Sequence, residues 1–151
     1  MSATQDVASP QPKKKQRTTP TPVQELVAHA VDAALEKKAH DIVVMDVRAV
    51  SGVADYFVVC TGDSDLQVKA IMEAIEERIR ERCREKPWHI EGREHRQWVL
   101  LDYVDLVVHI FAAEKRAFYD LERLWGDAPS EHVPDDADSA AVVQLLHEKS
   151  A

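Results

Sequence analysis

The chain has few glycines, and their positions exclude the common glycine-dependent sites. Its four glycines are Gly52, Gly62, Gly92 and Gly126. Neither the dinucleotide-binding pattern G-x-G-x-x-G nor the P-loop can be formed from them, because both need closely spaced glycines that let the backbone approach a phosphate. The G-x-S-x-G turn of many hydrolases is absent as well. The sequence therefore contains no phosphate cradle or nucleophile elbow of these types.

Cysteines and long apolar runs are also scarce. Cys60 and Cys83 lie far apart in apolar contexts and form no C-x-x-C motif, which is typical of reduced core cysteines. No apolar run approaches the ~20 residues that a membrane-spanning helix needs. The first residues are basic but no apolar stretch follows them, so a secretory signal is not expected. We expect a cytoplasmic protein that makes no contact with a membrane.

Patterns for metal binding are incomplete. His89 and Glu91 match the H-x-E half of a zinc deaminase site, but the P-C-x-x-C half is missing. His89 and His95 have no third ligand at helical or hairpin spacing. His109 lies inside an apolar run, where a core histidine is more common than a base, with a role at the edge of a site as the alternative. We expect no metal and no cofactor.

Carboxylates leave one enzymatic alternative open. Nucleotidyltransferases bind two metal ions through paired Asp residues, usually D-x-D after a Gly-Ser turn, and here Ser51–Gly52 precedes Asp55. No D-x-D follows, and Asp102 and Asp105 flank a predicted turn, where two carboxylates need not point the same way. A metal-dependent nucleotidyltransferase using Asp55, Asp102 and Asp105 is therefore the alternative function, and magnesium or manganese binding would distinguish it.

The formal net charge is −8, and residues 23–128 account for most of it, with 21 acidic against 14 basic side chains. An acidic surface is poorly suited to neutralising phosphates, so we expect at most a minor contact with RNA. It is well suited to a basic protein, because complementary potentials steer encounter and fix orientation.

Composition divides the chain into three segments. Residues 1–21 are rich in Ser, Thr, Gln, Pro and Lys with almost no apolar side chains, so a disordered basic tail is predicted. Residues 129–151 are acidic and interrupted by proline, and we predict a mostly disordered tail with a marginal helical turn at 140–147. Residues 22–128 suffice for one domain with a core of its own.

Apolar periodicity within 22–128 predicts the element order α-β-β-α-β-β-β-α. A capping box starting at Thr21 is expected to open the first helix, and Ser64 to cap the second. The predicted strands are 41–47, 55–61, 88–91, 98–101 and 106–111. A third helix over 113–125 is expected to bury Ala117, Phe118, Leu121 and Leu124. The connection 48–54 is too short for a parallel crossover, so part of the sheet is antiparallel. The fold class is α+β or α/β, a single mixed β-sheet of about five strands flanked by helices.

The predicted hairpin 98–111 is the first candidate for a functional surface, because aromatic and acidic side chains meet in it. Trp98 and Tyr103 lie at the two ends of its first strand and the neighbouring turn. Trp98 is interpreted as an interface anchor, with a core aromatic as the alternative. Successive side chains of a strand point to opposite faces, so only one of Leu100 and Leu101 faces inward.

Several segments together resemble one known family. They are A-D-Y-F-V-V-C-T-G at 54–62, Glu91–Gly92, W-V-L-L-D-Y at 98–103, V-V-H-I-F at 107–111 and F-Y-D-L-E-R-L-W at 118–125. In this order and spacing, from about residue 23 to 128, they resemble the ribosomal silencing factor family, also called Iojap-related. One departure is Val104, where the family usually has Gly and a β-branched residue resists positive φ.

The resemblance implies a nucleotidyltransferase-like fold without catalytic residues, and a binding protein rather than an enzyme. It implies a translation repressor that binds large-subunit ribosomal protein fourteen and blocks association of the two subunits, typically under nutrient limitation. Homodimers are common in the family. The partner-binding positions that it implies are Glu91, Trp98, Leu100, Leu101, Asp102, Tyr103 and Asp105. Both tails are expected to lie outside the resemblance.

Overall fold

The computed structural model describes residues 21–116, 120, 123 and 125–150. Residues 148–150 are described by their backbone alone. Its elements are α2 (Val23–Glu36), β1 (His40–Asp46), β2 (Tyr56–Gly62), α3 (Asp65–Cys83), β3 (His89–Glu91), β4 (Trp98–Asp102), β5 (Leu106–Ala112), α4 (Ala113–Arg116), β6 (Ser130–Val133), the 3₁₀ turn η2 (Ala140–Val142) and α6 (Gln144–Ser150). Up to β5 this is the predicted order; in the region of the helix predicted over 113–125, α4 ends at Arg116 and Asp120 is not helical. The side chains predicted to be buried by the third helix, Ala117, Phe118, Leu121 and Leu124, lie outside the described residues.

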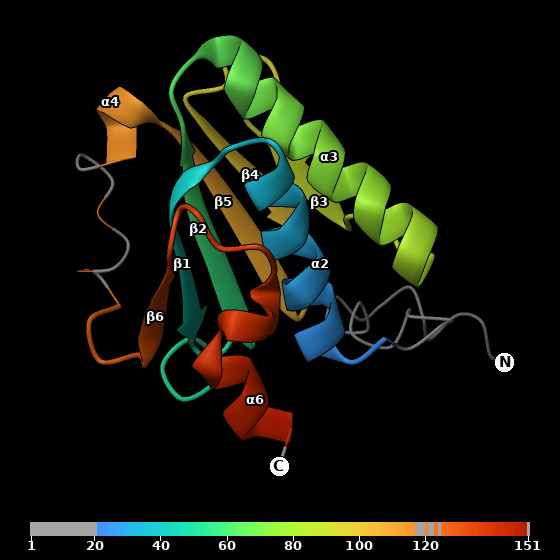
Figure 1. The fold of residues 1–151 in the computed structure, drawn as a ribbon, viewed down its shortest axis with the longest axis vertical. Coiled ribbons are helices and arrows are strands. Elements are labelled where there is room, and N and C mark those ends of the chain that lie inside the picture. The colour runs from blue at the N-terminus through green and yellow to red at the C-terminus, as the bar shows by residue number, and fades with distance from the viewer. Residues whose placement is uncertain (1–20, 117–119, 121–122, 124, 151) are drawn as a thin grey trace, which may run out of the picture.

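The described strands form one mixed sheet in the order β3-β4-β5-β2-β1-β6. β2 and β5 are parallel neighbours, whereas the other four pairs are antiparallel. The antiparallel pairing of β1 with β2 confirms the inference from their short connection. The sheet has six strands rather than about five, because β6 adds to the edge of β1 (Figure 1).

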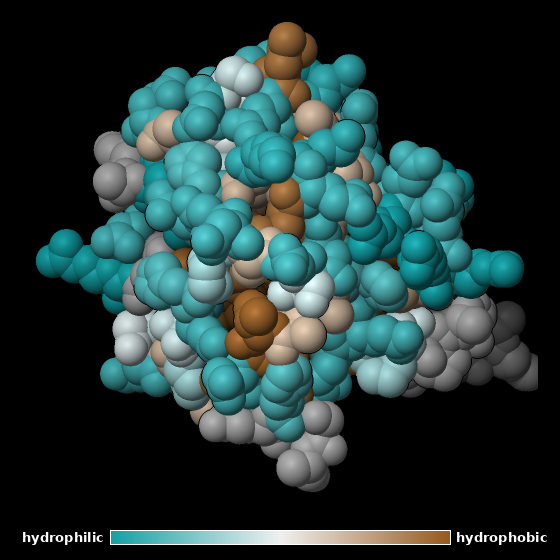
Figure 2. Space-filling view, in the orientation of Figure 1, coloured by the Kyte–Doolittle hydropathy of each residue, from teal (hydrophilic) through white to brown (hydrophobic). Residues whose placement is uncertain are grey.

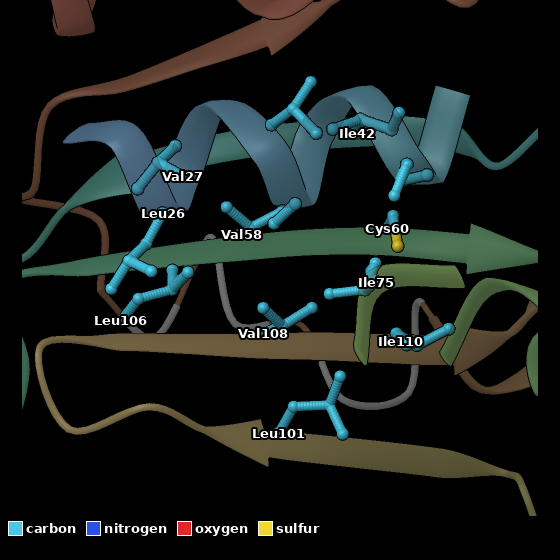
Figure 3. Packing of buried hydrophobic residues seen from close by; sticks show 14 of the residues in the cluster. Leu26, Val27, Ile42, Val58, Cys60, Ile75, Leu101, Leu106, Val108 and Ile110 are labelled. Atoms are coloured by element: carbon cyan, nitrogen blue, oxygen red, sulfur yellow. The ribbon is translucent and has the colours of Figure 1, made fainter. Parts of the chain in front are cut away.

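Helices α2 and α3 lie side by side over one face of the sheet, which we call the helix-covered face (Figure 1). The predicted inward stripe of α3 is fully buried there, and its members are Val68, Ile71, Met72, Ile75 and Ile79. Figure 3 shows aliphatic side chains of α2, α3 and the strands filling this layer. The outside of the helical layer is mostly hydrophilic (Figure 2). None of the described helices is long and apolar enough to cross a membrane.

The start of α3 has the predicted cap. Ser64 Oγ accepts a hydrogen bond from the backbone N–H of Gln67 at 3.0 Å. The Gln67 side chain accepts from the N–H of Asp63 and donates to the carbonyls of Lys37 and Lys38, at the end of α2. One glutamine therefore joins the start of one helix to the end of the other.

The capping box predicted for the first helix was wrong. Pro22 rather than Thr21 is the N-cap of α2, and this N-cap makes no side-chain capping hydrogen bond. The hydroxyl of Thr21 instead lies 3.5 Å from the carbonyl oxygen of Cys83, the last residue of α3. Carbonyls at the end of a helix have no partner within it, so they compete for such a donor.

The prediction that residues 129–151 are mostly disordered was also wrong. β6 pairs with β1 from Ile42↔Val133 to Met45↔Ser130. Four side chains of this segment are buried in the core of the helix-covered face: Val133, Ala140, Val143 and Leu146. Asp32 Oδ1 accepts from the N–H of Ala140, and Glu131 Oε1 accepts from the N–H of Leu145. Isolated anchors of this kind give no apolar period, which is the signal that the prediction relied on.

The opposite face of the sheet, which we call the aromatic face, carries Phe57, Trp98, Leu100, His109 and Phe111. These side chains alternate along β2, β4 and β5 with those of the helix-covered face. Phe111 is fully buried, whereas Trp98 and Leu100 are half-buried. The most exposed side chains of the hairpin that the sequence singled out therefore belong to this face.

Candidate protein-binding surface

Pairing of β4 with β5 settles which side each residue of the hairpin faces. Trp98 lies opposite Phe111, Leu100 opposite His109, and Leu101 opposite Val108. Leu101 is fully buried in the helix-covered core, where Figure 3 shows it in the same layer as Val108. Leu100 is half-buried on the aromatic face. Of the two leucines, Leu100 is the one that a partner can reach.

The turn of the hairpin places Val104 at a positive φ, the conformation that a glycine would adopt more easily. Val104 has a φ of +78°, in the region that β-branched residues resist. Its N–H donates to Asp102 Oδ1 at 2.8 Å, and the N–H of Tyr103 donates to the carbonyl of Leu106 at 2.8 Å. Asp102 therefore stabilises the turn in addition to presenting a carboxylate.

Tyr103 does not belong to an accessible surface. Only 2% of it is exposed, it lies in the helix-covered core, and desolvation by burial raises the pKa of its hydroxyl. With Leu101, it is removed from the predicted partner-binding set, because a side chain in the core cannot contact a partner without unfolding. The strand pattern could not show this for Tyr103, since the alternation ends where the turn begins.

Trp98 is held by two contacts on the aromatic face. Its indole N–H donates to His109 Nδ1 at 3.1 Å, and its ring stacks on Phe111 with centroids 5.1 Å apart. His109 itself is buried, as the sequence favoured, and desolvation lowers its pKa to about 3, so it is neutral at neutral pH. Trp98 thus combines the two interpretations, because one part of its ring packs and the rest stays accessible.

The edge strand β3 places Glu91 beside these residues. Glu91 lies opposite Leu100 and His89 opposite Asp102, so both side chains share the aromatic face. His89 Nε2 and Glu91 Oε2 are 2.8 Å apart. From the sequence, His89 is interpreted only as a possible metal ligand. Its spacing of two residues from Glu91 in a strand also predicts that both side chains lie on the same face of the sheet.

We call Glu91, Trp98, Leu100, Asp102 and Asp105 the hairpin surface. Four of these five residues are half-buried and Glu91 is exposed. Asp105 lies in the turn, where its carbonyl accepts hydrogen bonds from the N–H groups of Asp55 and Tyr56. An accessible indole and leucine bordered by carboxylates can bury apolar area against a basic protein and attract it.

The three carboxylates of the enzymatic alternative do not make a metal site. Asp55 and Asp105 are joined through their backbones, and the Asp102 carboxylate accepts from the N–H of Val104. In the part of the chain that the structure describes, no three His, Cys, Asp or Glu side chains come together in a way that could hold a metal ion. The donor set that a nucleotidyltransferase needs is therefore not assembled by these residues.

The chain is a single mixed α and β fold, with a candidate protein-binding surface on the face of the sheet opposite its helices. A family model described as "Ribosomal silencing factor during starvation" matches residues 20–150. The chain is 43% identical over 107 residues to ribosomal silencing factor RsfS of Halalkalibacterium halodurans, covering 71% of this chain and 91% of the relative. It is 44% identical over 100 residues to RsfS of Bacillus subtilis, covering 66% and 84%. The chain belongs to the RsfS family.

A solved structure agrees with this assignment. A crystal structure of a protein from Chromobacterium violaceum has a TM-score of 0.67 and 33% sequence identity, and the match covers 78% of this chain and 98% of that chain. The resemblance noted from the sequence is confirmed, and so is the conclusion that this family is a non-enzymatic one of regulators that bind the large ribosomal subunit. The family match extends to residue 150, so the C-terminal segment belongs to it, contrary to the expectation from the sequence.

Proposed function

We propose that the hairpin surface binds ribosomal protein fourteen of the large subunit, and that a large subunit carrying this chain cannot join the small subunit. Translation in the cytoplasm is thereby repressed, typically when nutrients are scarce. One observation carries the proposal: Trp98 and Leu100 are half-buried beside the carboxylates of Glu91 and Asp102, on the face of the sheet opposite α2 and α3.

The chemistry of this surface suits a basic protein partner. Tryptophan is the side chain most enriched among interface residues that dominate affinity, and an accessible apolar neighbour such as Leu100 helps to exclude water around it. The carboxylates of Glu91, Asp102 and Asp105 speed encounter with a basic protein, to which the net charge of −8 adds. The same charge repels phosphates, so contact with ribosomal RNA is minor in this proposal.

The free protein is proposed to form a homodimer. Burial of half-buried apolar side chains such as Trp98 and Leu100 against a second copy would lower the free energy of the dimer, because their apolar surface leaves water. Light scattering after size exclusion tests this: a dimer should be measured alone, and a one-to-one complex after addition of protein fourteen. A monomer at every concentration would contradict self-association while leaving the binding proposal intact.

Co-sedimentation with purified ribosomal subunits tests the proposal directly. The protein should migrate with free large subunits, be scarce on assembled ribosomes, and slow subunit joining. Trp98→Ala should weaken binding by about 2 kcal/mol or more, roughly 30-fold. Its cost in stability should stay below the roughly 3–5 kcal/mol of a fully buried aromatic, because Trp98 is partly accessible.

Trp88→Ala is the matched control. Trp88 precedes β3, is 55% exposed and lies outside the hairpin surface, so its removal should leave binding unchanged. Sedimentation mainly with small subunits or assembled ribosomes would contradict the proposal. So would a folded Trp98→Ala variant that binds large subunits as the wild type does.

A further inference from the structure

The orientation of Trp98 is fixed by residues of the neighbouring strand. Phe111 is directly opposite Trp98 in the pairing of β4 with β5, whereas His109 is opposite Leu100. The hydrogen bond from the Trp98 indole to His109 Nδ1 therefore runs diagonally between the strands. Phe111 supports the face of the indole and His109 holds its polar atom, so together they restrict both side-chain torsions of Trp98.

His109 is an unexpected residue for its position. β5 is buried along its whole length, and its other residues are apolar. A polar ring in such a strand is costly unless it is hydrogen-bonded, and among the described residues its Nε2 has no hydrogen-bond partner. Packing alone would favour an aliphatic side chain here. The bond that Nδ1 makes to Trp98 is the contact that an aliphatic side chain could not provide.

The ring of His109 is itself well supported. Phe57 of β2 meets it edge to face, with centroids 4.8 Å apart. Because Nδ1 accepts a hydrogen bond from the indole N–H, the neutral imidazole ring carries its own proton on Nε2. Burial lowers the pKa of His109 to about 3, so the acceptor is present throughout the neutral range. Phe57, His109 and Trp98 thus form a fixed series of contacts across β2, β5 and β4.

We propose that His109 is a positioning residue of the hairpin surface, whose Nδ1 holds the Trp98 indole in the orientation that the ribosomal partner contacts. His109 acts through Trp98 and does not touch the partner. This inference rests on the proposed function, in which Trp98 is the anchor. It adds that affinity depends on a buried acceptor that no partner residue reaches.

Two substitutions at His109 separate positioning from packing. His109→Leu fills the site but removes the acceptor, whereas His109→Asn keeps an amide oxygen near the place of Nδ1. His109→Leu should lower the affinity for purified large subunits by about tenfold without lowering the melting temperature. His109→Asn should restore the affinity to within about threefold of the wild type, although it packs less well than leucine.

Trp98→Phe removes the donor and leaves His109 in place. It should weaken binding by about as much as His109→Leu, and the double variant should be no weaker than either single one, because both remove the same interaction. In the wild type, the indole N–H of Trp98, observed by ¹⁵N NMR, should exchange with solvent more slowly than that of the exposed Trp88. In His109→Leu this protection should be lost.

The outcomes separate this inference from the proposed function. If Trp98→Ala binds large subunits normally, the proposed surface is wrong and His109 has nothing to position. If Trp98→Ala loses binding but folded His109→Leu binds normally, the surface stands and the positioning role is wrong. If His109→Leu does not fold, Trp98→Phe decides, and an unchanged affinity for that variant overturns the positioning role.

Discussion

The two faces of the sheet are built from alternate residues of the same strands, yet they differ in chemistry. The helix-covered face is almost entirely aliphatic and is covered by α2 and α3 (Figure 1). The aromatic face carries two buried polar side chains of β2 and β5, Thr61 and His109, each hydrogen-bonded to a residue of another element. These partners are Arg116 for Thr61 and Trp98 for His109. Polar contacts therefore fix side-chain directions on the aromatic face, whereas the helix-covered face is held mainly by apolar packing, with Asp46, which is bonded to Arg48 at the end of β1, as an exception.

The difference separates stability from recognition. Burial of apolar area is non-directional, so the helix-covered face tolerates many arrangements but loses free energy whenever volume is removed. A half-buried indole with a specific acceptor gives less burial but a defined geometry, which recognition needs. Substitutions on the first face should change folding, and those on the second should change binding. The four predictions below test this division, from the largest expected effect to the smallest.

Removal of residues 130–151 should have the largest effect on folding. It takes away β6 and three buried aliphatic side chains of the helix-covered core, Val133, Val143 and Leu146. Burial of one such side chain contributes roughly 1.5–3 kcal/mol, so the free energy of unfolding should fall by about 3 kcal/mol or more. Chemical denaturation measures the loss. A truncated protein as stable as the full chain would show that this segment does not contribute to the core.

Two adjacent valines provide the matched control for the truncation. Val143 is fully buried, whereas Val142 is 46% exposed. Val143→Ala should lower stability by about 1 kcal/mol or more, and Val142→Ala should stay within about 0.5 kcal/mol of the wild type. Equal effects would show that the loss does not come from packing of the buried Val143 side chain.

Leu101 and Leu100 compare the two faces within one strand. Leu101→Ala empties a fully buried site and should cost roughly 2–5 kcal/mol of folding free energy. Leu100→Ala removes a half-buried side chain and should cost about 1 kcal/mol while weakening large-subunit binding. Denaturation should show the larger loss of stability for Leu101→Ala, and co-sedimentation should show the larger loss of binding for Leu100→Ala. If Leu101→Ala reduces binding while fully folded, the assignment of the faces is wrong.

The sequence predicted the elements that depend on runs and periods. The stripe of α3, the buried strands and the hairpin all followed from apolar spacing, since each buries many side chains at regular intervals. Alternation alone could not tell whether Leu100 or Leu101 faces inward. It shows that successive side chains point to opposite faces, but which face is buried depends on the pairing with a neighbouring strand. The pairing of β4 with β5 shows that Leu101 faces the helix-covered core and Leu100 the aromatic face.

Features that depend on single long-range contacts escaped prediction. Val133, Val143 and Leu146 reach the core one at a time, and Thr21 finds a carbonyl of Cys83 instead of capping its own helix. The partner-binding site stays a prediction: family likeness and local chemistry both indicated the hairpin, and five of its seven predicted residues are accessible, whereas Leu101 and Tyr103 are buried. The bond between Trp98 and His109 needed the strand register, which no local pattern contains.

Charge on the aromatic face should change association more than folding. Asp102→Asn removes the negative charge but retains an oxygen that can accept from the N–H of Val104, so the turn should persist. Association with large subunits should slow by a few-fold at low salt, and its salt dependence should flatten. Glu81→Gln changes an exposed residue on α3 and is the control. Equal slowing by both variants would indicate that only total charge matters.

The smallest expected effect is a dependence of stability on pH that arises away from the hairpin surface. His40, the first residue of β1, lies 2.7 Å from Asp63 in the loop before α3 and 3.3 Å from Asp41. Burial lowers the pKa of His40, but hydrogen bonds and charge from Asp63 and Asp41 outweigh burial and raise it above its ordinary value of 6.5. A raised pKa contributes stability that is fully present below pH 6.5 and is lost as the pH rises through the pKa of the folded state.

The melting temperature of the wild type should therefore fall slightly as the pH rises from about 6 to 8, and His40→Gln should show a flatter profile. Asp63 is largely exposed, so solvent screening limits the difference to about 1 kcal/mol or less. His132→Gln, an exposed position on β6, is the matched control and should keep the wild-type profile. Large-subunit binding by His40→Gln should match the wild type at each pH, because His40 and Asp63 lie outside the hairpin surface. A change in binding without a change in melting would show that the two faces are coupled.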